Sequence, residues 1–173
     1  MPEIIRTFPD PAPAMRFIGK RYPGYGPWWG EWFANGWFDA VENAMGGPDR
    51  IKAIWENGGG YCGLERRVGS ELTDYWIGMF TPAGTKVPDG FECVDFPGGN
   101  IGTCWLRGKE DEVHDTSGFF PALDKAGIKP KKDAAVTDGH SGAVWIFENG
   151  LCPRFTTPDV NGNVILDWCC FAE

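Results

Sequence analysis

Apolar and polar residues alternate along the chain with two periodicities, one typical of helices and one typical of strands. Around residues 31–45, apolar residues recur at three- and four-residue intervals, which places them on one face of a predicted helix. They are Trp29, Phe33, Trp37, Val41 and Ala44. Gly46 and Gly47 can take the left-handed geometry that ends a helix, and Pro48 can open a further helical turn.

A second helix is expected within residues 110–126. Its apolar residues are Val113, Phe119, Phe120 and Leu123. Because Pro121 is tolerated only near a helix start, the helix is expected to begin late, with Ser117 as its cap, and to end at Gly127.

Short apolar runs bounded by turn residues predict the strands. They are expected at residues 16–22, 60–67, 74–82, 91–108, 143–150 and 163–173. The polar segment VGSELT joins the second and third of these strands, which predicts a hairpin. Pro97-Gly98-Gly99 interrupts the fourth, which predicts a bulge or a tight bend. Residues 1–15 contain four prolines and are expected to form a loose N-terminal arm or a short extended segment.

The order of these elements is β-α-β-β followed by β-α-β-β. The sequence therefore predicts one α+β domain over residues 1–173, built from a first half at 16–82 and a second half at 91–173. The halves are expected to form one antiparallel-rich sheet with helices on one face and a ligand cleft between the halves.

Composition narrows the classes of partner. The formal net charge of −8 argues against direct nucleic-acid binding and fits a cationic partner or plain solubility. No apolar run approaches the roughly 20 residues of a membrane span, and the N-terminus lacks the pattern of a signal peptide. Six cysteines without a C-x-x-C pair favour reduced thiols and no metal site. We expect a cytoplasmic protein without a cofactor or a membrane partner.

Aromatic residues make up 14% of the chain, and nine of them are tryptophans. Core packing explains some of these rings, but Tyr75 and Trp76 are neighbours in a strand and must point to opposite faces. Some aromatic side chains are therefore expected to line a cleft and to bind apolar rings or cations. The candidate ligand-binding aromatics are Trp29, Trp37, Tyr75, Trp76, Trp105, Trp145 and Trp168.

Glu148 is the candidate carboxylate, because it ends the otherwise apolar strand VWIFE. It can be a solvated strand end, the partner of a cationic ligand, or a catalytic acid or base. Glu65 is its counterpart in YCGLE of the first half, where Arg66 and Arg67 can pair with it. His114 and His140 both stand in polar, loop-like surroundings that do not indicate nucleophilic catalysis.

Several segments together resemble the GyrI-like small-molecule-binding domain family, the effector-binding domain of some AraC-type regulators. DYWIGMFTP is similar to the family's "d-Y-x-x-G" strand, and PDGFECVDFPGGNIGTCWLRG to its segment that contains "P-x-G". FFPALDKAGIKP resembles its helix exit, and IFENG with VILDWCCFAE its "F-E-x-Y" ending. The resemblance spans roughly residues 16–173, although Asn149-Gly150 stand where the family has an aromatic residue.

The resemblance implies two SHS2-like modules around a cleft that binds bulky, aromatic, often cationic compounds, with the family's drug-contacting Glu at Glu148. We therefore expect a stand-alone binder of hydrophobic or cationic small molecules, of the multidrug-binding or sequestering type. One alternative is a hydrolase of cyclopropanoid DNA-alkylating toxins, with Glu148 as its catalytic residue. Another is a protein-interaction module of the gyrase-inhibitor type, for which a protein partner is expected.

Overall fold

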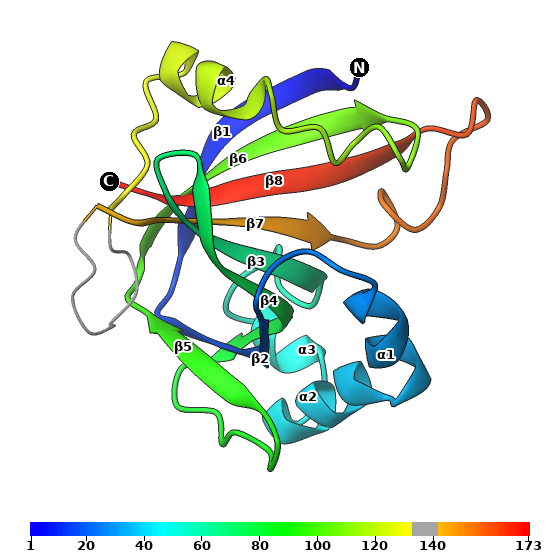
Figure 1. Cartoon of the computed structure of the whole chain (residues 1–173), viewed down its shortest axis with the longest axis vertical. Helices are drawn as coiled ribbons and strands as arrows, with labels where there is room; N and C mark the ends of the chain where they lie inside the picture. Colours follow the sequence, from blue (N-terminus) through cyan, green and yellow to red (C-terminus); the bar gives the residue numbers. More distant parts are fainter. Residues whose placement is uncertain (133–141) are drawn as a thin grey trace.

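The computed structural model describes residues 1–132 and 142–173, and these residues form one eight-stranded sheet and four short helices (Figure 1). The strands are β1 (Glu3–Ala12), β2 (Met15–Tyr22), β3 (Tyr61–Val68), β4 (Glu71–Pro82), β5 (Glu92–Phe96), β6 (Gly99–Gly108), β7 (Val144–Gly150) and β8 (Val164–Ala172). The helices are α1 (Trp28–Ala34), α2 (Trp37–Met45), α3 (Asp49–Lys52) and α4 (Phe119–Lys125). Within the described part of the chain, no helix combines the length and apolarity needed to cross a bilayer.

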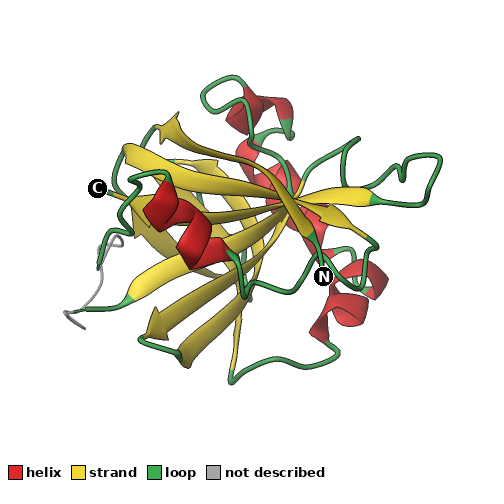
Figure 2. Cartoon of the chain, turned by 90° about the horizontal axis from the view of Figure 1, so that it is seen from above, coloured by secondary structure: helices red, strands yellow, loops and turns green. Residues whose placement is uncertain are grey.

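The strands lie in the order β1-β6-β8-β7-β3-β4-β2-β5, and each neighbouring pair is antiparallel. The fold is therefore α+β and rich in antiparallel sheet. The central pair, β3 with β7, joins the strands that follow the two helical regions. Figure 2 shows that the sheet is strongly twisted. Its edge strands are β1 and β5.

The sheet curls around an aromatic core on one side, which we call the inner face. Phe96 of β5 stacks on Phe171 of β8 with ring centroids 4.2 Å apart, although four strands lie between these two. In a flat sheet with strands about 4.8 Å apart, their separation would be about 24 Å. Trp145 also contacts Phe96, and Phe80 packs against Phe147 at the centre of this core.

The opposite side, the outer face, carries helices over its two ends. Phe38 of α2 stacks on Tyr61 of β3 with centroids 3.8 Å apart. At the other end, a side chain at Gly102 of β6 would contact Leu123 of α4 at 3.1 Å, so glycine there lets the helix approach closely. Between these helices, the loop before α4 lies on the sheet, because the Trp168 Nε1 donates to the carbonyl of Val113 at 3.0 Å.

The predicted continuous helix over 31–45 is wrong, because the chain forms two helices that meet at Asn35-Gly36. Gly36 has a φ of 64°, which ends α1 and restarts the helix in a new phase. The predicted apolar face therefore matches the buried one only in part: Val41 is buried as expected, but Phe33 is 62% exposed, and Trp32 and Met45 are buried instead. The left-handed glycines at 46 and 47 and the helical turn after Pro48 are observed as predicted.

The second helix does begin late, but Ser117 is not its cap. The N-cap is Gly118, which makes no side-chain capping bond, and Pro121 lies in the first turn as expected. Instead, the backbone N–H of Ser117 donates to the carboxylate of Asp115, a local turn that competes with helix. The helix closes at Gly127, whose φ is 71°.

The predicted strand over 91–108 is two strands with different partners. β5 pairs with β2, whereas β6 pairs with β1 and β8. Of the two alternatives for Pro97-Gly98, the tight bend is therefore observed and the bulge is not, because these residues carry the chain between two parts of the curled sheet. Of the alternatives for residues 1–15, the extended one is observed, since Glu3–Ala12 pairs with β6 along its length.

Candidate functional site

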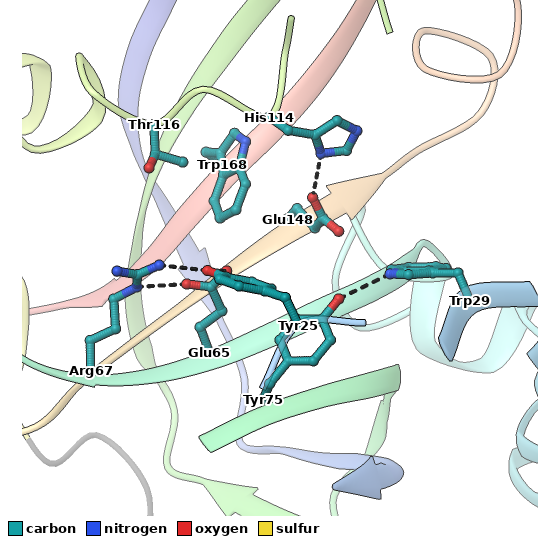
Figure 3. Close-up of a pocket in the computed structure, with 9 residues that line it drawn as sticks. All are labelled: Tyr25, Trp29, Glu65, Arg67, Tyr75, His114, Thr116, Glu148 and Trp168. Atoms are coloured by element: carbon teal, nitrogen blue, oxygen red, sulfur yellow. Dashed lines mark hydrogen bonds and ion pairs between the residues drawn. The ribbon is translucent and has the colours of Figure 1, made fainter. Parts of the chain in front are cut away.

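Two adjoining cavities open on the outer face of the sheet. One, the polar lobe, has a volume of about 420 Å³, and the other, the aromatic lobe, about 410 Å³. Trp29, His114 and Glu148 line both, so the lobes meet at these three residues. The polar lobe adds Tyr25, Glu65, Arg67, Tyr75, Thr116 and Trp168 (Figure 3). The aromatic lobe adds Phe33, Tyr61, Phe155 and Leu166, with Glu110 and Thr156 as its polar members.

Strand register brings the site's sheet residues onto the outer face. Glu65 of β3 stands opposite Tyr75 of β4, and Glu148 of β7 stands opposite Trp168 of β8. Gly63 is the β3 residue opposite Glu148, two positions before Glu65. Since alternate residues of a strand share a face, both carboxylates project into the same cavity from neighbouring strands.

Glu148 forms a hydrogen-bonded pair with His114 where the two lobes meet. Its Oε2 lies 2.8 Å from the His114 Nδ1, and the side chains are 14% and 47% exposed, respectively. The hydrogen bond to Glu148 raises the pKa of His114, although partial burial opposes it. Gly63 makes room for this carboxylate, because a Cβ at that position would lie only 2.8 Å from the Glu148 Oε1.

Glu65 is held in a closed network of three side chains. The hydroxyl of Tyr25 donates to Glu65 Oε1 at 2.7 Å, and Arg67 Nε donates to Glu65 Oε2 at 2.6 Å. Arg67 Nη2 also donates to the Tyr25 hydroxyl oxygen at 2.6 Å. Burial and the bond to Glu65 raise the pKa of Tyr25 to about 12, so its hydroxyl stays protonated at neutral pH.

A Trp-Tyr hydrogen bond ties α1 to the sheet beside these carboxylates. Trp29 Nε1 donates to the Tyr75 hydroxyl at 3.0 Å, as Figure 3 shows. Burial, followed by the nearby charge of Glu148, raises the pKa of Tyr75. The Tyr75 hydroxyl is therefore protonated at neutral pH, and its own proton can be donated to a ligand.

The structure brings together four of the residues selected from the sequence: Glu148, Trp29, Tyr75 and Trp168. Trp76, Trp105 and Trp145 lie on the inner face instead, where Trp105 contacts Phe8 and both Arg6 and Arg154. The fourth remaining residue, Trp37, lies on α2, with the Lys20 ammonium 4.4 Å from its ring centroid.

Sequence reasoning missed His114, Tyr25 and Thr116. These three lie in loops, and no periodicity places a loop side chain. Arg67 was named as a possible partner of Glu65, and the ion pair is observed; Arg67 lies two residues after Glu65 in a strand and so shares its face. His114 had been assigned to polar loop surroundings, yet it lines both lobes, while His140 lies outside the described residues.

No protein-family model and no curated protein sequence matches this chain. Solved structures do match it over nearly its whole length. A Staphylococcus aureus MU50 protein named for bacterial transcription regulation has a TM-score of 0.61 at 10% identity, covering 97% of this chain and 98% of that one.

Two further solved structures match the chain over a similar length. SAV2435 bound to tetraphenylphosphonium has a TM-score of 0.55 at 10% identity, covering 98% of this chain and 94% of that one. A hydrolase encoded by lin2189 from Listeria innocua has a TM-score of 0.54 at 11% identity, covering 97% and 92%. At such identities the likeness establishes a shared fold.

The two carboxylates of the site differ in their chemistry. Glu65 is neutralised by a guanidinium that remains charged at any physiological pH. Glu148 is paired with an imidazole, whose charge depends on pH. When His114 is neutral, Glu148 is a partly buried anion surrounded by aromatic rings, which can bind a cation or accept a proton.

Proposed function

We propose that the cavity binds bulky, aromatic, cationic small molecules and that Glu148 supplies the countercharge. One observation carries this proposal: a carboxylate that is 14% exposed lies among Trp29, Tyr75 and Trp168, and its ion-pair partner among the described residues is a titratable histidine. A partly buried anion attracts a cation more strongly than a solvated one, and each aromatic ring face adds roughly 0.5–2 kcal/mol.

The same proposal includes a GyrI-like domain of two β-α-β-β modules that sequesters such compounds in the cytoplasm. The element orders β2-α1-α2-α3-β3-β4 and β6-α4-β7-β8 support the two modules. The fold shared with SAV2435, which binds the bulky cation tetraphenylphosphonium, supports the class of ligand.

Tetraphenylphosphonium is the direct probe, and binding can be followed by tryptophan fluorescence, because Trp29 and Trp168 line the cavity. Glu148→Gln keeps the shape but removes the charge, and we expect it to weaken binding about tenfold, or about 1.4 kcal/mol. Glu92→Gln, the same change at an exposed position of β5, is the control. Equal affinity in wild type and Glu148→Gln, or no binding at high micromolar ligand, would refute the proposal.

A second candidate function is hydrolysis of strained electrophiles, favoured by the His114–Glu148 pair beside the protonated Tyr75 hydroxyl. A carboxylate-imidazole pair can take a proton from water as the water oxygen bonds to a ring carbon and the strained ring bond breaks, while a neighbouring acid group protonates the atom of the same molecule that receives the electron pair. Incubation with a cyclopropanoid duocarmycin-type compound would give, by mass spectrometry, a ring-opened product heavier by one water. This candidate requires turnover that Glu148→Gln abolishes, and unchanged compound would exclude it.

A further inference from the structure

From the two lobes and their junction, we infer that the preferred ligand is an aromatic amino glycoside: a planar aromatic body joined to an amino sugar. This inference rests on the proposed function and specifies the class of compound. Each lobe is within the size range of small-molecule sites, and a ligand that fills both must pass the residues they share.

The aromatic lobe fits a planar apolar body. Tyr61 is fixed by its stack on Phe38, and Phe155 packs against Gly150, where a Cβ would lie only 3.0 Å from the Phe155 ring. Phe33 borders the same lobe and is 62% exposed. A planar ring system placed between these side chains would remove their apolar surface from water, at roughly 25 cal/mol per Å².

The polar lobe fits hydroxyl groups better than it fits an apolar or an anionic group. Glu65 and Glu148 offer acceptor oxygens, while Arg67, Tyr75 and Thr116 offer donors. An apolar group would displace water from these side chains and offer no hydrogen bonds in place of those the water made. An anion would be repelled by both carboxylates. A hydroxyl both donates and accepts, so it can satisfy either kind of neighbour.

The junction fits a protonated amine. Glu148 and the ring of Trp29 border both lobes, so an ammonium group placed there contacts a carboxylate and an aromatic ring at once. An ammonium can also donate a hydrogen bond to Glu148, which a phosphonium cannot. In a glycoside of a 3-amino-4-hydroxy sugar, the amine lies between the aromatic body and the sugar hydroxyl, which is the order of the three environments in the cavity.

Daunorubicin is a suitable probe, and its own fluorescence anisotropy reports binding. Two relatives separate the contributions: N-acetyldaunorubicin keeps the hydroxyl but lacks the charge, and the aglycone lacks the amino sugar altogether. We expect affinity to fall in that order, by about tenfold from the amine to its acetyl form and by a further severalfold to the aglycone. An aglycone that binds as tightly as daunorubicin would overturn the inference.

A variant of the polar lobe tests whether the sugar of daunorubicin binds there. Thr116→Val removes one hydroxyl from the polar lobe at constant shape, and we expect it to weaken daunorubicin severalfold without affecting the aglycone. Thr157→Val, at an exposed loop position, is the matched control. If Thr116→Val leaves daunorubicin binding unchanged, the sugar does not occupy the polar lobe and the inference fails.

Tetraphenylphosphonium distinguishes this failure from failure of the proposed function. If tetraphenylphosphonium binds in a Glu148-dependent way but daunorubicin is no tighter than its aglycone, the general cation site stands and only the glycoside class is wrong. If tetraphenylphosphonium and daunorubicin both fail to bind, both proposals are wrong.

Discussion

Gly63 is expected to control the position of Glu148, so Gly63→Ala perturbs the site without removing any functional group. The added Cβ would lie 2.8 Å from Glu148 Oε1 and 3.3 Å from its Cγ and Cδ, whereas an ordinary contact begins at 3.4 Å. The carboxylate must therefore move by about 0.6 Å. A comparable increase in its 2.8 Å separation from His114 Nδ1 would exceed the normal range for a hydrogen bond, which ends near 3.2 Å.

The energetic consequence is modest. A hydrogen bond between charged groups contributes about 1.5–3 kcal/mol when buried, but His114 is nearly half exposed, which reduces the expected value to about 1 kcal/mol. The bond raises the pKa of His114, so its contribution to stability is complete at low pH and is lost as pH rises through that pKa. The difference in unfolding free energy between wild type and Gly63→Ala should therefore shrink with increasing pH.

Two measurements test whether Gly63→Ala weakens the hydrogen bond between His114 and Glu148. NMR titration of the His114 imidazole should show a lower pKa in Gly63→Ala than in wild type, and urea unfolding at acidic and alkaline pH should show the pH-dependent loss. Gly99→Ala is the control, because Gly99 is an exposed strand residue with no atom within 4 Å of an added Cβ. Identical titration of His114 in wild type and Gly63→Ala would refute the reasoning.

Two further predictions concern charge. Tetraphenylphosphonium should bind more tightly as pH rises through the pKa of His114, because protonated His114 competes with the ligand for Glu148. If the competition is complete, Kd falls by about tenfold for each pH unit of increase below that pKa. A Kd that does not depend on pH would contradict this prediction. His114→Gln should remove this dependence. Asp167→Asn should cost about 3 kcal/mol in urea unfolding, because Asp167 is 1% exposed and accepts from Arg154 at 2.6 and 2.8 Å. Asp159→Asn, in an exposed ion pair, should cost much less, and equal losses would show that burial does not decide the effect.

The strands of the site could be predicted because a strand's period of two needs only local information. Alternation placed Tyr75 and Trp76 on opposite faces, and the structure has Tyr75 in the cavity and Trp76 on the inner face. The same rule places Arg67 on the face of Glu65 and Arg66 on the opposite face. Of the two arginines named as possible partners it therefore favours Arg67, which forms the observed ion pair.

The helices were harder to predict because one residue can reset their phase. An isolated glycine such as Gly36 is tolerated within a helical pattern, so the sequence does not reveal that it takes a φ of 64° there. Because α1 and α2 do not share one helical phase, the buried face of α1 carries Trp32, and Phe33 is exposed to the aromatic lobe.

The positions of loop side chains depend on contacts between segments that are distant in the sequence. His114 follows Val113, which is fully buried and whose carbonyl accepts the Trp168 indole N–H. That anchor fixes where the loop crosses β8 and so brings the imidazole to Glu148. Nothing near residue 114 in the sequence encodes a contact with residue 168, which explains why His114 was not selected.

The different partners of the two carboxylates explain why Glu148, and not Glu65, is the proposed countercharge. Displacing Arg67 from Glu65 would leave a permanent charge without its partner, which is costly in a partly buried site. Displacing His114 from Glu148 requires only that the imidazole lose its proton as pH rises through its pKa. A ligand cation can therefore replace the charge of His114 at Glu148, while the Glu65 network keeps the polar lobe in shape.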